Sequence, residues 1–424
     1  MRVAPLFARF SLLFLLLTSV VSPQSVRVPK IFAQNQNVPQ APPLVEIPLA
    51  TAAHIERAKN SWWPTKNAQA REDFVGNQAC MNCHAEKTAS QLTTPMAHAA
   101  SNIATAKILR DHPILGTVRG PFKYSMATTS AGHSYSVSDG TNKLSATILW
   151  AFGIGNKGQT YLYQRDGEFY ESEVSFYPAV NGLDVTTGHE QKRPKTLEEA
   201  LGTLQDRPTA EKCFGCHATG ATTVSNGFAP EYAAPGLICE ACHGPGGAHV
   251  VLMQQLQSEG TALPGTLQIL NPRSFNPIAS VDFCGACHRT WTDVYEMQSG
   301  ATGPVNARFQ PYRLENSKCW GEGDARLVCT ACHDPHRPLR HDAATYDAKC
   351  LACHSAVVRP YPAAKRPKLA TPSRSRKPRI AEPCSVAKAN CVTCHMPKIN
   401  VPVMHSDFTD HRIRIVRKGE PYPE

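Results

Sequence analysis

The chain has 424 residues, of which 42% are hydrophobic and 8% aromatic, and its formal net charge is +10 at pH 7. No aromatic or helical nucleic-acid-binding motif accompanies this basic excess, so the sequence argues against a nucleic-acid-binding protein. Beyond the N-terminus, no apolar stretch reaches the roughly 20 residues of a membrane-spanning helix, which argues against a protein with several membrane spans.

The N-terminus has the pattern of a secretory signal. Met1 to Arg9 carries two arginines and precedes an apolar run from Phe10 to Val21, which correspond to the n-region and the h-region of a signal peptide. We predict a signal peptide over residues 1–33, with cleavage between 22 and 33, and a periplasmic or otherwise extracytoplasmic location. Membrane association is expected only if this N-terminus stays uncleaved.

Two segments are predicted to be irregular. Residues 34–71 scatter prolines among Gln, Asn and Ala without helical or strand periodicity, which is typical of a flexible linker. Residues 358–383 combine lysine and arginine with proline, and we interpret them as a solvated surface loop rather than a docking arm for an acidic partner. Residues 72–415 are expected to form one domain, followed by a tail at 416–424.

A β-rich segment lies in the first half of the chain. Residues 146–153 form an apolar run, and two alternating stretches flank Asp166-Gly167, a dipeptide that favours a tight hairpin turn. We therefore predict a small antiparallel β insertion at 118–180. Elsewhere 34 prolines and 27 glycines interrupt the chain, so the predicted fold class is mostly irregular and α-helical with this one β insertion.

Cys-x-x-Cys-His occurs seven times. The cysteines of these motifs are Cys80, Cys83, Cys213, Cys216, Cys239, Cys242, Cys284, Cys287, Cys329, Cys332, Cys350, Cys353, Cys391 and Cys394. The histidines that follow them are His84, His217, His243, His288, His333, His354 and His395. This is the attachment motif of haem c: two thiols form thioethers with one porphyrin, and the adjacent imidazole binds the iron. A zinc knuckle or a redox dithiol would not need the fixed histidine, so we predict seven covalent haems.

Only two of the 16 cysteines lie outside the motifs, Cys319 and Cys384. Thioether haems are attached outside the cytoplasm, where a disulfide can persist. We therefore predict a Cys319–Cys384 disulfide, with two free buried thiols as the alternative. Each ferric haem with two histidine ligands adds about −1 through its propionates, so seven of them nearly cancel the basic excess of the chain.

Distal ligands decide whether the irons can bind a substrate, because a haem with two side-chain ligands has no open position. The histidines outside the motifs are His54, His98, His112, His133, His189, His249, His336, His341, His405 and His411. This supply neither forces an open iron nor closes all seven. For any of His112, His133 and His189, an ordinary surface or hydrogen-bonded role is favoured over ligation, and His54 and His341 are not expected to be ligands.

Three segments carry a more specific resemblance. They are CEACHGPGGAH at 239–249, CTACHDPHR at 329–337, and CVTCHMPK at 391–398 followed by His405 and by TDH at 409–411. From Asp73 to Ile415 the chain resembles a secreted multihaem cytochrome c family, similar to the tetrahaem cytochromes of ammonia oxidisers and, more distantly, to pentahaem nitrite reductases. This resemblance implies that His249, His336, His405 and His411 are distal ligands. For the first haem both Met96 and His98 are available, and His98 is favoured.

The predicted function is that of an extracytoplasmic heptahaem cytochrome that transfers electrons in respiratory redox metabolism. Short intervals between motifs predict closely packed haem pairs joined into one chain. Its expected partners are other cytochromes or quinol-oxidising complexes, with no nucleic acid among them, and no catalytic residue is assigned. The alternative is a multihaem oxidoreductase in which one open haem acts on a small nitrogen or sulfur compound. No motif has Lys in place of His, a replacement that would indicate a nitrite reductase.

Overall fold

The computed structural model describes residues 70–102, 104–130, 132–260, 267–290, 293–294, 303–320, 324, 326–355 and 384–422. The chain divides into two compact units, Met1–Pro48 and Leu49–Glu424, and all described residues belong to the second. The predicted signal peptide, the linker up to residue 69, His54 and the basic loop at 358–383 lie outside the described residues. Among the described helices, none is long and apolar enough to cross a membrane.

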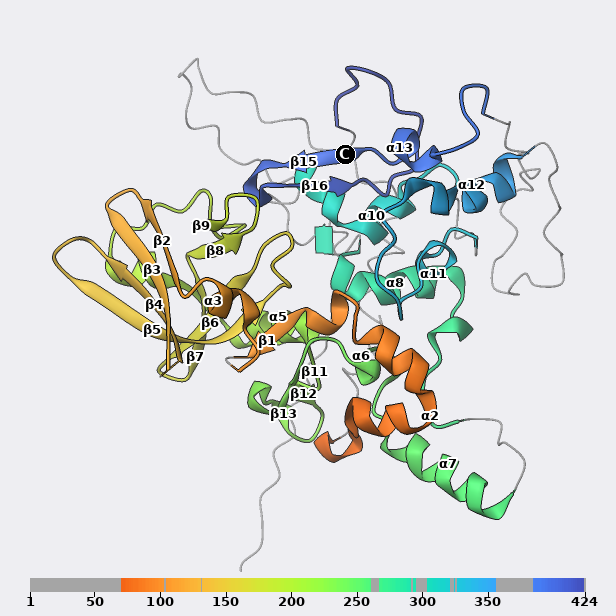
Figure 1. The fold of residues 1–424 in the computed structure, drawn as a ribbon, viewed down its shortest axis with the longest axis horizontal. Helices are drawn as coiled ribbons and strands as arrows, with labels where there is room; N and C mark the ends of the chain where they lie inside the picture. The colour runs from red at the N-terminus through yellow and green to blue at the C-terminus, as the bar shows by residue number, and fades with distance from the viewer. Residues whose placement is uncertain are drawn as a thin grey trace, which may run out of the picture. The chain divides into compact units, whose positions relative to one another are not determined.

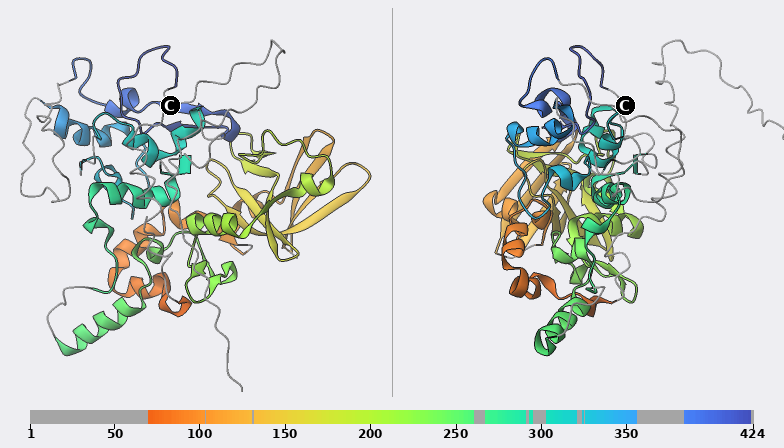
Figure 2. Two further views of the ribbon diagram at one scale, coloured as in Figure 1. Left: turned by 180° about the vertical axis from the view of Figure 1, so that it is seen from behind. Right: turned by 90° about the vertical axis from the view of Figure 1, so that its right-hand side faces the viewer.

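An eight-stranded antiparallel sheet is the largest element (Figure 1). Its strands are β1 (Ala100–Asn102), β2 (Ile114–Arg119), β3 (Phe122–Thr129), β4 (Gly132–Ser138), β5 (Lys143–Phe152), β6 (Thr160–Arg165), β7 (Glu168–Ser172) and β10 (Gly202–Gln205). The order is β10-β7-β6-β5-β4-β3-β2, with β1 also paired to β5. Figure 2 shows the same strands from behind. The predicted turn at Asp166-Gly167 is confirmed, because both residues have positive φ (51° and 83°) and join β6 to β7.

The predicted fold class is wrong. Instead of a small insertion at 118–180 in a mostly irregular and helical chain, the protein has a large antiparallel sheet followed by a helical C-terminal region. The strands that the prediction missed are short or lie at an edge. β1 and β10 have three and four residues, and they are defined by their pairing with β5 and β7 rather than by a pattern of their own. Ile114 and Val118 of edge strand β2 are exposed, which hid the alternation there.

Small two-stranded sheets complete the β structure. Their strands are β8 (Val174–Tyr177) with β9 (Gly182–Val185), β11 (Ala218–Thr219) with β14 (Ala234–Pro235), β12 (Thr222–Thr223) with β13 (Gly227–Phe228), and β15 (Lys398–Val401) with β16 (Ser406–Thr409). The main sheet buries an apolar core that includes Tyr135 and Tyr163. A second core packs Phe214 against Trp150 and Phe152 of β5, and this contact fixes a motif-bearing helix to the sheet.

Motifs 2 to 7 lie at the C-terminal ends of short helices, whereas motif 1 lies in the first half of a 16-residue helix. These helices are α2 (Gly76–Gln91), α5 (Arg207–His217), α6 (Cys239–His243), α8 (Pro277–His288), α11 (Cys329–Cys332), α12 (Asp347–His354) and α13 (Cys391–His395). Asp206 and Asn276 cap α5 and α8, and each helix has a proline in its first turn, the expected start signals of a helix. In α2 the helical geometry is interrupted at His84.

The other described helical elements lie between the motif helices or pack against the sheet. They are the α-helices α3 (Lys107–Asp111), α4 (Leu197–Leu201), α7 (Gly247–Glu259) and α10 (Gln310–Glu315), and the 3-10 helices η1 (Arg71–Asp73), η2 (Met96–His98), η3 (Pro230–Tyr232), η4 (Pro272–Ser274), η5 (Gly303–Arg308), η6 (Ala343–Tyr346) and η8 (Pro402–Met404). Of these, α7 directly follows motif 3 and carries His249.

Candidate haem-binding site

A cavity of about 3490 Å³ is lined by both cysteines of motifs 1, 3, 4, 5 and 6 and by Val392 and Thr393 of motif 7. Its volume is several times the ~300–1,000 Å³ of an ordinary ligand site. Helix α7 contributes His249, Val250, Met253 and Leu256 to its wall, together with Gln254 and Gln257, and no residue of this helix is buried by protein. An open space of this size, lined in part by exposed apolar side chains, fits several flat, apolar macrocycles.

The thiols of different motifs meet in pairs. Thiols of different motifs are neighbours in three pairs: Cys80 with Cys239, Cys216 with Cys287, and Cys284 with Cys329. A fourth contact joins Cys350 to Cys391. The Cys80 contact lowers the pKa of Cys239 to about 7. In the haem-bound protein these sulfurs would be thioethers, which do not titrate, so what matters is that the attachment points of different motifs lie side by side.

Two further pairs of cysteines from different motifs also lie near each other. Cys242 of motif 3 is a neighbour of Cys284 of motif 4, and Cys332 of motif 5 is a neighbour of Cys350 of motif 6. These relations join motif 3 to motif 4 and motif 5 to motif 6. With the four pairs above, they link all seven motifs into one connected set.

Several imidazoles are oriented by backbone carbonyl groups. The Nδ1 atoms of His217, His243 and His395 lie 2.9, 2.8 and 2.8 Å from the carbonyl oxygens of Ala99, Leu270 and Arg414. A carbonyl oxygen only accepts, so each Nδ1 carries the proton and leaves the Nε2 lone pair available. This is the arrangement in which a protein presents histidine to a metal.

Two of the predicted distal histidines have the same arrangement. Nδ1 of His249 lies 2.7 Å from the carbonyl oxygen of Leu267, and Nδ1 of His411 lies 3.0 Å from that of Thr409. Burial lowers the pKa of His411 to about 4. His411 is therefore neutral at physiological pH, which is the form that binds a metal.

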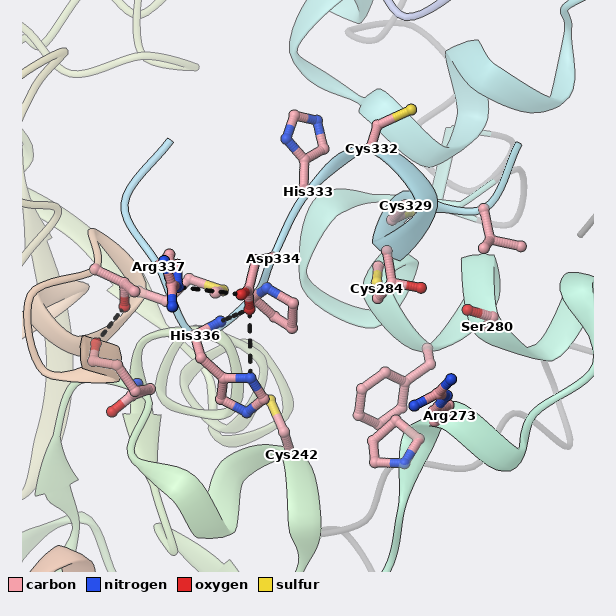
Figure 3. Close-up of a pocket in the computed structure, with 18 of the residues that line it drawn as sticks. Cys242, Arg273, Ser280, Cys284, Cys329, Cys332, His333, Asp334, His336 and Arg337 are labelled. Atoms are coloured by element: carbon pink, nitrogen blue, oxygen red, sulfur yellow. Dashed lines mark hydrogen bonds and ion pairs between the residues drawn. The ribbon is translucent and has the colours of Figure 1, made fainter. Parts of the chain in front are cut away.

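Two pairs of imidazoles face each other across the cavity. The ring centres of His243 and His336 are 6.1 Å apart with planes at 12°, and those of His333 and His411 are 6.3 Å apart at 44°. Two metal–nitrogen bonds of about 2 Å, plus about 1 Å from each nitrogen to its ring centre, give a separation of roughly 6 Å. Each pair therefore has room for one iron. Figure 3 shows His336 on the loop after motif 5, with Asp334 and Arg337 beside it and Cys242 of motif 3 nearby.

Other predicted ligands are placed differently. Nε2 of His405 lies 2.8 Å from Oδ2 of Asp184, and its ring packs edge-on against Tyr177, so a carboxylate occupies the nitrogen expected to face iron. His98 is exposed and is not part of the cavity wall, whereas Met96 is. These positions do not test ligation, so the distal ligand of the first haem stays a prediction.

The histidines of the sheet region have partners there. Nδ1 of His133 lies 2.8 Å from the Thr128 hydroxyl oxygen, and the His189 ring contacts the carboxylates of Glu171 and Glu173. Sequence reasoning missed two residues beside motif histidines. Phe152 stacks on His217 with ring centres 4.8 Å apart, and Gln310 lies beside His288. Neither residue has a sequence pattern that could have identified it.

The predicted Cys319–Cys384 disulfide is not formed. Both residues are free, exposed cysteines. Cys319 lies near Cys353 of motif 6 instead, while the amide of Ala387 donates to the sulfur of Cys384. Pairing by elimination assumed that the two leftover thiols lie close together, and the fold gives each a different neighbour.

Comparisons with known proteins agree with this chemistry in part of the chain. Residues 175–244, which include motifs 2 and 3, match the family described as cytochrome c554 and c-prime. No curated protein matches the chain. The crystal structure of the outer cell wall cytochrome OcwA is similar, with 18% sequence identity and a TM-score of 0.31. The match covers 51% of this chain and 37% of the OcwA chain. This chain therefore spans little more than a third of the length of OcwA. The segment 175–244 is thus part of a multihaem c-type cytochrome domain, which implies covalently bound haem and electron transfer.

Proposed function

We propose that the protein is an extracytoplasmic heptahaem c-type cytochrome that carries electrons between redox partners, such as other cytochromes or a quinol-oxidising complex. When bound, each haem supplies an iron that changes its oxidation state by one electron. The chain's own residues hold the macrocycles by thioethers, orient the imidazoles through backbone carbonyls and exclude water. The observation that carries this proposal is the contact between cysteines of different motifs.

Those contacts define a path. Motif 1 meets motif 3 through Cys80 and Cys239, motif 3 neighbours motif 4, and motif 4 meets motif 5 through Cys284 and Cys329. Motif 5 neighbours motif 6, and motif 6 meets motif 7 through Cys350 and Cys391. The proposed order is therefore 1-3-4-5-6-7, which differs from chain order. Short steps favour this order because electron tunnelling weakens steeply with distance.

Motif 2 is a side branch in this proposal. Cys216 meets Cys287 of motif 4, and helix α5, which carries motif 2, packs against β7 and β10 of the sheet. Figure 1 supports the arrangement: α2 and α6 lie together, α8 and α11 follow, and α12 lies near α13. Electrons would enter at motif 1 or motif 7 and leave at the other end without passing through the haem of motif 2.

The haem load is the first test. Intact mass spectrometry of the denatured holo-protein should give the mass of the mature chain plus seven haems, and five or fewer haems would overturn the proposal. Low-temperature electron paramagnetic resonance should then show low-spin haems that are indifferent to nitrite, hydroxylamine and sulfite. A high-spin signal that shifts with one of these ligands would favour an oxidoreductase instead.

The branched path is tested by two matched double variants. Cys284→Ala with Cys287→Ala removes the haem of motif 4, and Cys213→Ala with Cys216→Ala removes that of motif 2. Both proteins should carry six haems. After rapid mixing with a reductant, the motif 4 variant should reduce its haems in kinetically separated groups, namely haems 1 and 3, haem 2 alone, and haems 5 to 7. The motif 2 variant should behave like the wild type with one haem fewer. Equal kinetics in the two variants would contradict the branch.

A further inference from the structure

A buried carboxylate joins the helices of motifs 1 and 3. Glu240 lies inside motif 3 and is 1% exposed. Its Oε1 accepts hydrogen bonds from the backbone amides of Val75 (2.9 Å) and Gly246 (2.8 Å), and its Oε2 accepts one from Gly76 (2.8 Å). Val75 and Gly76 stand at the start of α2, the helix of motif 1. One side chain therefore connects the start of one motif helix to the motif of its neighbour.

The same joint is reinforced from the other side. The backbone amide of Cys239 donates to Oδ1 of Asn77 at 3.2 Å. The backbones also approach closely: a Cβ at Gly247 would lie 3.0 Å from the carbonyl oxygen of Asp73, so glycine is the residue that fits there. Cys80 is one helical turn beyond Gly76, and its sulfur meets that of Cys239. A shift of the start of α2 would therefore displace the Cys80 sulfur relative to that of Cys239.

A second carboxylate does the same for motifs 6 and 7. Asp347 is the first residue of α12, the helix of motif 6, and is 9% exposed. Its Oδ2 accepts from the backbone amide of Asn390 (2.7 Å) and its Oδ1 from that of Cys391 (2.9 Å), where α13 begins. Cys391 is itself an attachment residue and contacts Cys350. A carboxylate that joins two motif helices is therefore present at both ends of the proposed path.

We propose that Glu240 and Asp347 are positioning residues that set the separation and orientation of the haem pairs 1–3 and 6–7, and with them the electron transfer within each pair. This inference rests on the proposed function. A carboxylate can accept several N–H donors at once, and such charge-assisted bonds are roughly twice as strong as neutral ones. An amide in its place keeps one acceptor oxygen and turns an NH₂ group toward backbone N–H groups. The two motif segments that the carboxylate holds together must therefore move apart.

The test compares Glu240→Gln and Asp347→Asn in the full-length holo-protein. The readouts are haem load by mass, the low-spin resonance signals of the ferric haems, and a spectroscopic redox titration. Signals of haems 1 and 7 are identified by their loss in Cys80→Ala/Cys83→Ala and in Cys391→Ala/Cys394→Ala proteins. We expect Glu240→Gln to alter the signals and potentials of the 1–3 pair, and Asp347→Asn those of the 6–7 pair, with the other pair unchanged in each case.

Two variants control for charge alone. Glu86→Gln removes a negative charge from α2, where Glu86 is exposed and faces Arg337 at 3.7 Å. Asp342→Asn removes a negative charge from the segment before α12, where Asp342 caps the 3-10 helix η6. Both controls should keep wild-type resonance signals. Wild-type signals and potentials in Glu240→Gln and Asp347→Asn at full haem load, or changes in the same haems in both, would overturn the inference.

A third variant tests the inference in case Glu240→Gln does not attach all of its haems. Asn77→Ala withdraws a single hydrogen bond from the 1–3 joint and leaves the carboxylate in place. At full haem load it should shift the same 1–3 signals by a smaller amount, and unchanged signals would count against the inference. The haem load of the wild type tests the proposed function separately, because a protein without seven haems would fail there whatever the variants do.

Discussion

The imidazole rings of His243 and His336 lie nearly parallel, with ring centres 6.1 Å apart, although His243 belongs to motif 3 and His336 follows motif 5. His333 of motif 5 faces His411, which follows motif 7. In both pairs the candidate distal ligand comes from a segment that carries a different haem. An iron in either site would therefore join two separate parts of the chain, so haem attachment and tertiary folding are expected to be coupled.

The first prediction concerns His336. Replacing it by alanine should remove one axial ligand from the haem of motif 3 and convert one low-spin haem per protein to a high-spin or water-bound form, which electron paramagnetic resonance would count. His133→Ala is the matched control, because His133 lies in the sheet region, where its Nδ1 contacts the Thr128 hydroxyl, and is not part of the cavity wall. Retention of all low-spin signals in His336→Ala would show that this ring is not a ligand.

The second prediction separates two histidines of the C-terminal segment. His411 faces a motif histidine, whereas Nε2 of His405 is held by Asp184 at 2.8 Å. His411→Ala should generate a high-spin haem, and His405→Ala should leave every haem low-spin while it removes the link between Asp184 and the β15–β16 hairpin. A new high-spin signal in His405→Ala would restore the role that the family resemblance implies.

His405 also illustrates where sequence reasoning ends. Its place after the seventh motif resembles the family pattern, but its partner Asp184 is 221 positions away. Such a pairing depends on how the sheet meets the C-terminal hairpin, and no local pattern encodes it. The motif residues were predictable for the opposite reason, because haem attachment requires two thiols and an imidazole at fixed spacing.

In the fold, too, local features were predictable from sequence, whereas long-range pairings were not. The β6–β7 hairpin was predictable because Asp166-Gly167 provides the positive φ angles that a tight turn needs. Strand β10 was missed because Gly202–Gln205 pairs with β7 only after an intervening helix has returned the chain to the sheet edge. Glu240 lies within a recognised motif, yet its role depends on amides more than 160 positions earlier.

A third prediction uses the buried His189. Burial opposes its protonation, but hydrogen bonds to Glu171 and Glu173 outweigh this and raise the pKa of His189 above its ordinary value. A raised folded-state pKa stabilises the protein below the unfolded value of about 6.5, and this contribution is lost as the pH rises through the folded pKa. The midpoint of thermal unfolding should fall over that range in the wild type. His189→Gln should flatten the dependence and exposed His341→Gln should not; an unchanged slope in His189→Gln would refute the assignment.

The last prediction concerns the ion pair between Arg313 and Asp410. Nε of Arg313 lies 2.8 Å from Oδ1 of Asp410, and both side chains are 0% exposed. Asp410→Asn removes the negative charge that this buried guanidinium faces, so we expect a loss of about 3–5 kcal/mol in the free energy of unfolding. The exposed pair of Lys107 and Asp111 provides the control, since Asp111→Asn should leave the free energy of unfolding nearly unchanged.

Denaturant unfolding of the holo-protein measures both losses. The pH dependence adds an independent check. Burial alone would raise the pKa of Asp410, but Arg313 outweighs it and lowers that pKa. The stabilisation is therefore present above the unfolded value of about 3.9 and is lost as the pH falls toward the folded pKa. The difference between wild type and Asp410→Asn should shrink over that acidic range, and a difference that stays constant down to the lowest pH would place the stabilisation elsewhere than in this charge pair.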